Sequence, residues 1–295
     1  MTAVLVLVAS VLGGCTTTAD EPQASAPASS AATTSGGSPA QSTPRQVNLG
    51  DSYSAAAGVQ PLVEDSPVLC LRSSRNFAHL LAAARGYRLD DVSCSGADTT
   101  DFFTAQYAGV PAQLDALAGG PDVVTVMIGG NDSAVYTTAI RACSDVAATD
   151  PSGSPCRAAH GTEYVDIVRD RTYPALARAL AAVRAKAPGA QVLAVGYPWI
   201  LPAQTGCYPT MRVAAGDVPY LRELQAVLNR SVQRAAEQAG VTYVDMSGVS
   251  EGHDACAPVG TRWIEPQVGA TGAAPAHPNE LGQQAIADQV AAALR

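Results

Sequence analysis

The chain is poor in positive charge and in aromatic residues. Lysine occurs once in 295 residues, no basic run is present, and the formal net charge is −8, so we expect no nucleic-acid partner. Aromatic residues make up 5 %, which leaves alanine, valine and leucine to fill most of a core. No CxxC pair and no cluster of His and Asp with ligand spacing occurs, so we expect no metal and no other cofactor.

An apolar run of signal-peptide length, too short to span a bilayer, extends from Ala3 to Leu12. The next residues, Leu12-Gly13-Gly14-Cys15, resemble a bacterial lipobox, in which cleavage before the cysteine frees it for lipid attachment. We therefore expect a signal peptide over residues 1–14 and lipidation of Cys15. The alternative is an ordinary secretory signal with an incidental cysteine, and no Lys or Arg precedes the apolar run.

Ser, Thr, Ala, Pro and Gly dominate the segment that follows. Such a composition cannot bury enough apolar surface to offset the entropy of ordering, so we expect a disordered tether over residues 15–45. Random-coil scaling gives that tether a reach of roughly 30 Å. We expect an exported protein, either extracellular or held at the cell surface as a lipoprotein, that contacts the membrane only through its lipid anchor.

Six cysteines remain after Cys15, and their even number in an exported chain predicts three disulfides. They are Cys70, Cys94, Cys143, Cys156, Cys207 and Cys256. Sequence spacing alone permits fifteen pairings among them.

Short apolar runs alternate with longer helical patterns over residues 46–295, which we expect to form one domain. The expected strands are Gln46–Leu49, Arg88–Ser93, Val123–Ile128, Gln191–Gly196 and Thr242–Asp245. The expected helices are Arg75–Arg85, Pro111–Ala118, Glu163–Lys186, Tyr220–Ala239 and Glu280–Leu294. This alternation predicts an α/β fold with a parallel sheet between helices, in which ligands bind at the carboxyl ends of the strands.

Two polar turns follow expected strands. Gly50-Asp51-Ser52 follows the first, and a serine exposed there is a candidate nucleophile once a base takes its proton. Gly129-Gly130-Asn131-Asp132 follows the third, and the Asn131 amide is a candidate donor to the oxyanion of a tetrahedral intermediate. The backbone N–H of Gly96 is a second candidate donor. His277, which precedes a proline and the last helix, is the candidate general base.

Together these residues resemble the SGNH (GDSL-type) hydrolase family over roughly Val47 to Leu294. The resemblance implies a three-layer α/β/α sandwich with a five-stranded parallel sheet of flavodoxin-like order. It implies that Ser52 is the nucleophile, that Ser52, Gly96 and Asn131 form the oxyanion hole, and that His277 is the base. The six cysteines and Gly196-Tyr197-Pro198 are similar to those of secreted actinobacterial lipases and esterases, which implies sequential pairing: Cys70–Cys94, Cys143–Cys156 and Cys207–Cys256.

The sequence departs from the family three residues before His277, where Ala274 replaces the usual aspartate. Some family members orient the histidine with a main-chain carbonyl, and here the carbonyl of Pro275 or Ala274 could accept its Nδ1–H. The alternative is that Asp254 or Glu265 reaches the histidine from an adjacent loop.

We expect a monomeric carboxylic ester hydrolase of lipase or esterase type that acts on a small-molecule acyl ester or lipid through an acyl-enzyme. The Thr205–Tyr220 loop and the Arg262-Trp263-Ile264 stretch could line its acyl pocket. The alternatives are a carbohydrate O-deacetylase of the same family and a non-catalytic lipoprotein that binds a surface ligand.

Overall fold

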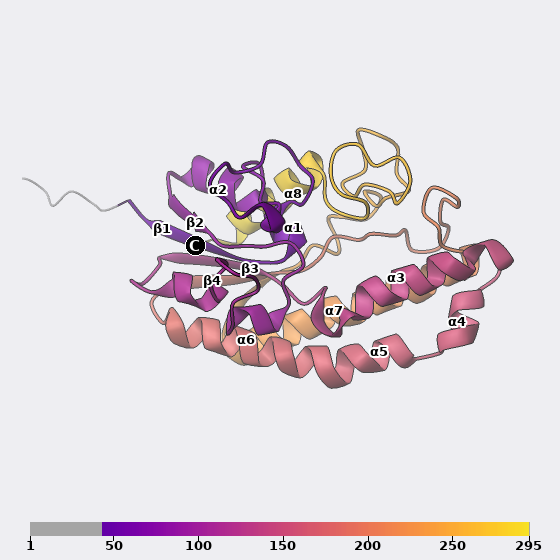
Figure 1. Cartoon of the computed structure of the whole chain (residues 1–295), viewed down its shortest axis with the longest axis horizontal. Coiled ribbons are helices and arrows are strands. Elements are labelled where there is room, and N and C mark those ends of the chain that lie inside the picture. Colours follow the sequence, from indigo (N-terminus) through magenta and orange to yellow (C-terminus); the bar gives the residue numbers. More distant parts are fainter. Residues whose placement is uncertain (1–42, 295) are drawn as a thin grey trace, which may run out of the picture. The chain divides into compact units, whose positions relative to one another are not determined.

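A five-stranded parallel sheet forms the centre of the domain (Figure 1). The computed structural model describes residues 43–294, so the expected signal peptide, Cys15 and tether residues 15–42 lie outside the described residues. The strands are β1 (Arg45–Gly50), β2 (Arg88–Asp91), β3 (Val123–Met127), β4 (Gln191–Val195) and β5 (Thr242–Val244). Their order is β2-β1-β3-β4-β5, the flavodoxin-like order, and its switch point, where a ligand site is expected, lies between β1 and β3.

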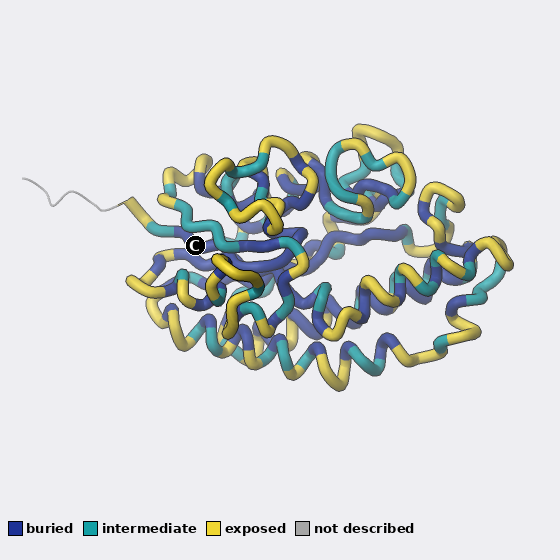
Figure 2. Tube along the Cα trace, in the orientation of Figure 1, coloured by how far each residue is buried: buried dark blue, intermediate teal, exposed yellow. Residues whose placement is uncertain are grey.

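Helices cover both faces of the sheet, which gives three layers. They are α1 (Ser52–Ala55), α2 (Phe77–Arg85), α3 (Val135–Val146), α4 (Pro155–His160), α5 (Glu163–Ile167), α6 (Tyr173–Lys186), α7 (Val218–Ala239) and α8 (Glu280–Ala293). Figure 1 shows α2 and α8 on one face and α6 and α7 on the other. Burial follows the three central strands, β1, β3 and β4, and the inner sides of these helices, whereas the edge strands are mostly half-buried (Figure 2). Within residues 43–294, no helix is both long and apolar enough to cross a membrane.

The elements differ from the sequence expectations in four places. β1 begins at Arg45, one residue before the expected domain boundary, because Arg45 pairs with Asp90 on β2. The expected helix Pro111–Ala118 is a 3-10 turn over Gln113–Leu117. The expected helix Glu163–Lys186 contains a π turn at Val168–Thr172, where Pro174 lacks the N–H that would continue the α-helical bonds. Helices α1, α3 and α4 were not predicted.

Three disulfides, in sequential order, anchor loops around the carboxyl ends of the strands. Cys70–Cys94 joins the loop after α1 to the loop after β2, and Cys143–Cys156 joins α3 to α4. Cys207–Cys256 joins the segment after β4 to the segment after β5. Each bridge therefore limits the freedom of chain segments that lie outside regular sheet pairing.

Gly50 ends β1 in a conformation that a side chain cannot adopt easily. Its φ is +144°, and an added Cβ would lie 2.3 Å from the Met127 carbonyl oxygen and 2.7 Å from the Ser54 Cβ. The Gln113 side chain bonds both backbone groups of Gly50, accepting from its N–H at 2.7 Å and donating to its carbonyl at 3.0 Å. The turn that follows β1 is thus set by close backbone packing.

We expect Gly50→Ala to lower the free energy of unfolding by about 2–4 kcal/mol, because it combines overpacking with backbone strain. Gly86→Ala is the matched control: its φ is +67°, but an added Cβ would meet nothing within 4 Å. That variant should lose only about 1 kcal/mol. Urea denaturation midpoints measure both, and equal losses would contradict a packing role for Gly50.

Candidate active site

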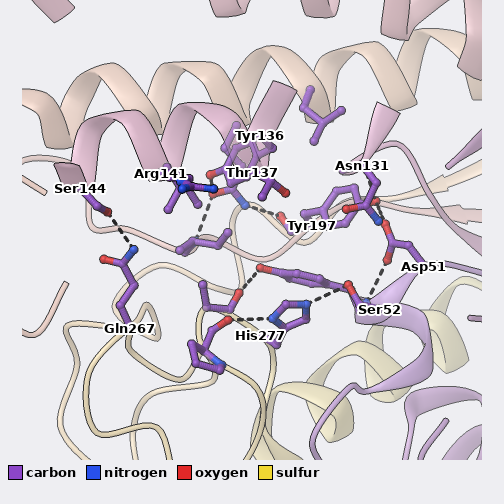
Figure 3. A pocket seen from close by; sticks show the side chains of 18 of the residues that line it. Asp51, Ser52, Asn131, Tyr136, Thr137, Arg141, Ser144, Tyr197, Gln267 and His277 are labelled. Carbon is purple, nitrogen blue, oxygen red and sulfur yellow. Dashed lines mark hydrogen bonds between the residues drawn. The ribbon is translucent and has the colours of Figure 1, made fainter. Parts of the chain in front are cut away.

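Ser52 and His277 meet at the carboxyl edge of the sheet, although 225 positions separate them. Ser52 is the first residue of α1, directly after β1, and His277 lies in the loop that leads into α8. The His277 Nε2 lies 2.8 Å from the Ser52 Oγ (Figure 3). Ser52 is mostly buried and His277 is half-buried, and both line one cavity. The pair can therefore move a proton from the hydroxyl to the imidazole beside a space that admits a ligand.

The carbonyl of Pro275 faces the imidazole. It lies 2.8 Å from the His277 Nδ1, whereas the Ala274 carbonyl accepts the backbone N–H of His277 at 3.1 Å. A carbonyl can only accept, so Nδ1 carries the hydrogen and Nε2 is left to accept from the Ser52 hydroxyl. Of the two carbonyls that the sequence left open, the structure puts Pro275 at the imidazole.

The two carboxylates considered as alternatives are bound elsewhere. Glu265 is buried, accepts from Arg262 at 2.8 Å and from the Asn279 amide at 2.9 Å, and has a lowered pKa despite its burial, because these donors stabilise the charge. Asp254 accepts from the backbone N–H of Cys256 at 2.9 Å. Among residues 43–294, His277 is bonded through its ring to Ser52 and Pro275, and neither carboxylate of the alternative makes a hydrogen bond to it.

Tyr53 supports the loop that carries the histidine, and the sequence analysis missed it. Its hydroxyl donates to the Ala276 carbonyl at 2.5 Å, and its ring lies 5.0 Å from the imidazole between centroids. Ala276 has a φ of +61°, which is unfavourable for a residue with a side chain. The only sequence signal for this role is the position of an aromatic residue directly after Ser52.

Donors to a negative oxygen are available at the same edge. The Asn131 amide donates one hydrogen to the Ala97 carbonyl at 2.9 Å, which orients the amide and leaves its second hydrogen free. The backbone N–H groups of Ser52 and Gly96 make no hydrogen bond with any other residue in the described range. Asn131 and Ser52 line the cavity, whereas Gly96 is exposed and is not part of the lining.

The aspartates of the two polar turns have structural partners. Tyr197 donates to the Asp51 carboxylate at 2.5 Å and accepts from the Gly130 N–H at 2.9 Å, so its hydroxyl connects the turn after β1 to the turn after β3. Asp132 accepts from the Thr99 hydroxyl at 2.7 Å. Burial raises the pKa of Asp51 to about 7 and that of Asp132 to about 6.

The cavity has a volume of about 510 Å³ and extends from Ser52 between α3 and α7. Its lining includes Tyr136 and Ile140 of α3 and Leu228 of α7. Of the two segments expected to line a pocket, Thr205–Tyr220 contributes Arg212, while Arg262-Trp263-Ile264 lies outside the lining. Within residues 43–294, no cluster of three or more His, Cys, Asp or Glu side chains could hold a metal ion.

Comparison with known proteins gives consistent matches. The model of the GDSL-like lipase/acylhydrolase family matches residues 49–285. A protein named Lipase 2 from Streptomyces coelicolor is 53 % identical over 255 residues, which cover 85 % of this chain and 86 % of that protein.

Two solved structures share the fold. The crystal structure of phospholipase A1 from Streptomyces albidoflavus has a TM-score of 0.71 at 25 % identity and covers 85 % of this chain and 100 % of its own. That of an extracellular lipase from Streptomyces rimosus has a TM-score of 0.70 at 24 % identity with the same coverage of both chains.

Burial lowers the pKa of His277 below its usual 6.5, and the bond to Pro275 only partly opposes this shift. We therefore expect the imidazole to be neutral at pH 6.5 and above, with the hydrogen on Nδ1, and to become charged only as the pH falls further. A titration of the ¹⁵N imidazole signals by NMR, with His277→Gln to assign them, measures both properties. A neutral form with its hydrogen on Nε2 would contradict the geometry.

Proposed function

Because this chain belongs to the GDSL-like lipase/acylhydrolase family, it is an ester hydrolase, and we propose that it cleaves carboxylic esters through an acyl-enzyme formed on Ser52. The observation that carries this proposal is the 2.8 Å contact between the Ser52 Oγ and the His277 Nε2, beside a cavity that reaches the hydroxyl.

In the first half-reaction, the His277 Nε2 takes the proton of the Ser52 hydroxyl as its oxygen attacks the ester carbonyl. The negative oxygen of the tetrahedral intermediate accepts hydrogen bonds from the N–H groups of Ser52 and Gly96 and from the free hydrogen of the Asn131 amide. The intermediate collapses, and the imidazolium gives its proton to the leaving alcohol. In the second half-reaction, the His277 Nε2 takes a proton from water as the water oxygen attacks the acyl carbon. The bond from that carbon to the Ser52 Oγ then breaks, the imidazolium returns the proton to Oγ, and the acid is released.

The proposed machinery is a dyad, because Pro275 provides a neutral carbonyl where a triad has a carboxylate. The carbonyl holds the tautomer and ring orientation that proton transfer requires. It stabilises the imidazolium less than a charged group would.

The proposed substrate is a small-molecule acyl ester or lipid. Apolar side chains of the cavity, among them Ile140, Ile200 and Leu228, can take up an acyl chain next to the nucleophile. The similarity to proteins named as lipases and to a phospholipase A1 supports the same class. We further propose that the protein acts as a monomer.

We also propose that the protein works outside the cytoplasm, exported by the signal peptide over residues 1–14 and held by Cys15 and the tether. Three disulfides agree with an oxidising compartment, and a similar structure is that of an extracellular lipase.

We expect Ser52→Ala to lower kcat on p-nitrophenyl acyl esters by about 10⁴-fold or more while the fold is retained, since it removes the nucleophile. Wild type should form a covalent adduct with a fluorophosphonate probe, seen as a mass increase on the peptide that contains Ser52. An adduct that persists in Ser52→Ala would contradict the assignment. Release of acetate from an acetylated polysaccharide, without cleavage of longer acyl esters, would favour the deacetylase alternative.

Asp254→Asn and Glu265→Gln test the dyad. We expect each variant to keep kcat within about tenfold of wild type, because neither carboxylate contacts the histidine, whereas loss of a triad aspartate costs about 10⁴-fold. Thermal unfolding of each variant separates a catalytic defect from a folding defect. A loss of about 10³-fold or more in a variant that melts like wild type would refute the dyad.

A further inference from the structure

Two parallel stripes of side chains run along the cavity side of α3. Tyr136 and Ile140 form an apolar stripe, which is buried or half-buried. Thr137, Arg141 and Ser144 form a polar stripe one position further around the helix, and its first two members are exposed. The spacing of four and then three residues puts the polar side chains on one line of the helix surface. The cavity therefore has an apolar floor and a polar rim along the same wall.

Arg212, in the segment between β4 and α7, lines the same cavity and is exposed. The Gln267 side chain connects the two walls: its Nε2 donates to the Ser144 hydroxyl at 3.0 Å, and its Oε1 accepts from the Arg212 backbone N–H at 2.6 Å. Figure 3 shows Ser144 and Gln267 at the end of the cavity opposite Ser52 and Asp51. The Gln267 side chain thus fixes the segment that carries Arg212 next to the helix that carries Arg141.

Neither guanidinium has a partner among the described residues. By contrast, Arg45, Arg222 and Arg262 each pair with a carboxylate. Among the described residues that line the cavity, Asp51 is the only acidic one, and it lies at the Ser52 end, bound to Tyr197. The far rim therefore offers two positive charges to a ligand, with no competing carboxylate in the lining.

We propose that Arg141 and Arg212 form a subsite for a phosphodiester on the alcohol part of the substrate, so that the preferred substrate is an anionic glycerophospholipid. This inference rests on the ester hydrolysis proposed above. Guanidinium groups bind phosphate oxygens through paired, charge-assisted hydrogen bonds. Arg141 and Arg212 are exposed, so a charged headgroup bound between them stays in contact with water.

The test compares kcat/KM on phosphatidylglycerol and on diacylglycerol with identical acyl chains, each in mixed micelles of one nonionic detergent. Wild type should prefer phosphatidylglycerol. The double variant Arg141→Gln/Arg212→Gln should lose about tenfold on phosphatidylglycerol, mainly through KM, and less than twofold on diacylglycerol. The wild-type preference should also shrink as salt is added, because the rim is exposed.

Arg157→Gln/Arg171→Gln is the matched control. It removes the same number of charges from exposed arginines outside the cavity lining, so it equals the test variant in net charge. We expect it to keep the wild-type preference. An equal loss in this control would attribute the effect to general attraction between the protein and an anionic micelle, and would overturn the subsite.

Other outcomes also overturn the proposal. An equal loss of kcat/KM on both lipids in the Arg141→Gln/Arg212→Gln variant would show that the arginines maintain the shape of the cavity and do not bind a headgroup. Inhibition of diacylglycerol turnover by inorganic phosphate, abolished in the same variant, would assign the rim to a free anion. A preference for esters with a carboxylate at the end of the acyl chain would show that the rim binds an anion on the acyl part of the substrate and not on the alcohol part. Activity of wild type on p-nitrophenyl acyl esters but on neither lipid would also overturn the subsite. Failure on all three substrates would instead refute the proposed function, which separates the two conclusions.

Discussion

The bond from the His277 Nδ1–H to the Pro275 carbonyl is the constraint on which the site depends. It sets the tautomer and leaves Nε2 for the Ser52 hydroxyl. A carbonyl two residues away can reach the ring only if the intervening residue turns sharply, and Ala276 does so at a φ of +61°. Two hydrogen bonds hold this strained turn. The Tyr53 hydroxyl donates to the Ala276 carbonyl, and the Ala276 N–H donates to the main-chain carbonyl of Glu265.

A buried polar network fixes the two turns that carry Ser52 and Asn131. Tyr197 links the carboxylate of Asp51 to the backbone of Gly130, so the turn with the hydroxyl and the turn with the amide are held by one side chain. Burying Asp51 is unfavourable for its charged form, as its raised pKa shows. That cost is offset only while the donors remain in place, which makes the network sensitive to loss of any member.

Much of the architecture could be predicted because the strands are short apolar runs between turns. The five strands lie within two residues of the expected ranges. Helix α3 escaped prediction, because Thr137, Thr138 and Arg141 interrupt its apolar pattern where it borders a cavity instead of the core. The family motifs named Ser52, Asn131 and His277. Tyr53 belongs to no such pattern, and Tyr197 was noted only within a stretch similar to that of secreted lipases and esterases, without a role. Their roles depend on partners more than 60 residues away in the sequence.

By itself, the sequence determined the order of strands and helices, the even set of cysteines and the residues able to supply a hydroxyl, an imidazole and an amide. These follow from local periodicity and side-chain chemistry, which need no knowledge of distant contacts. Tertiary structure alone decided that Pro275, and not Ala274 or a carboxylate, faces the imidazole, and that two arginines share one rim. Such choices turn on shifts of one residue or a few ångströms between segments far apart in the chain, and local pattern carries no information about those distances.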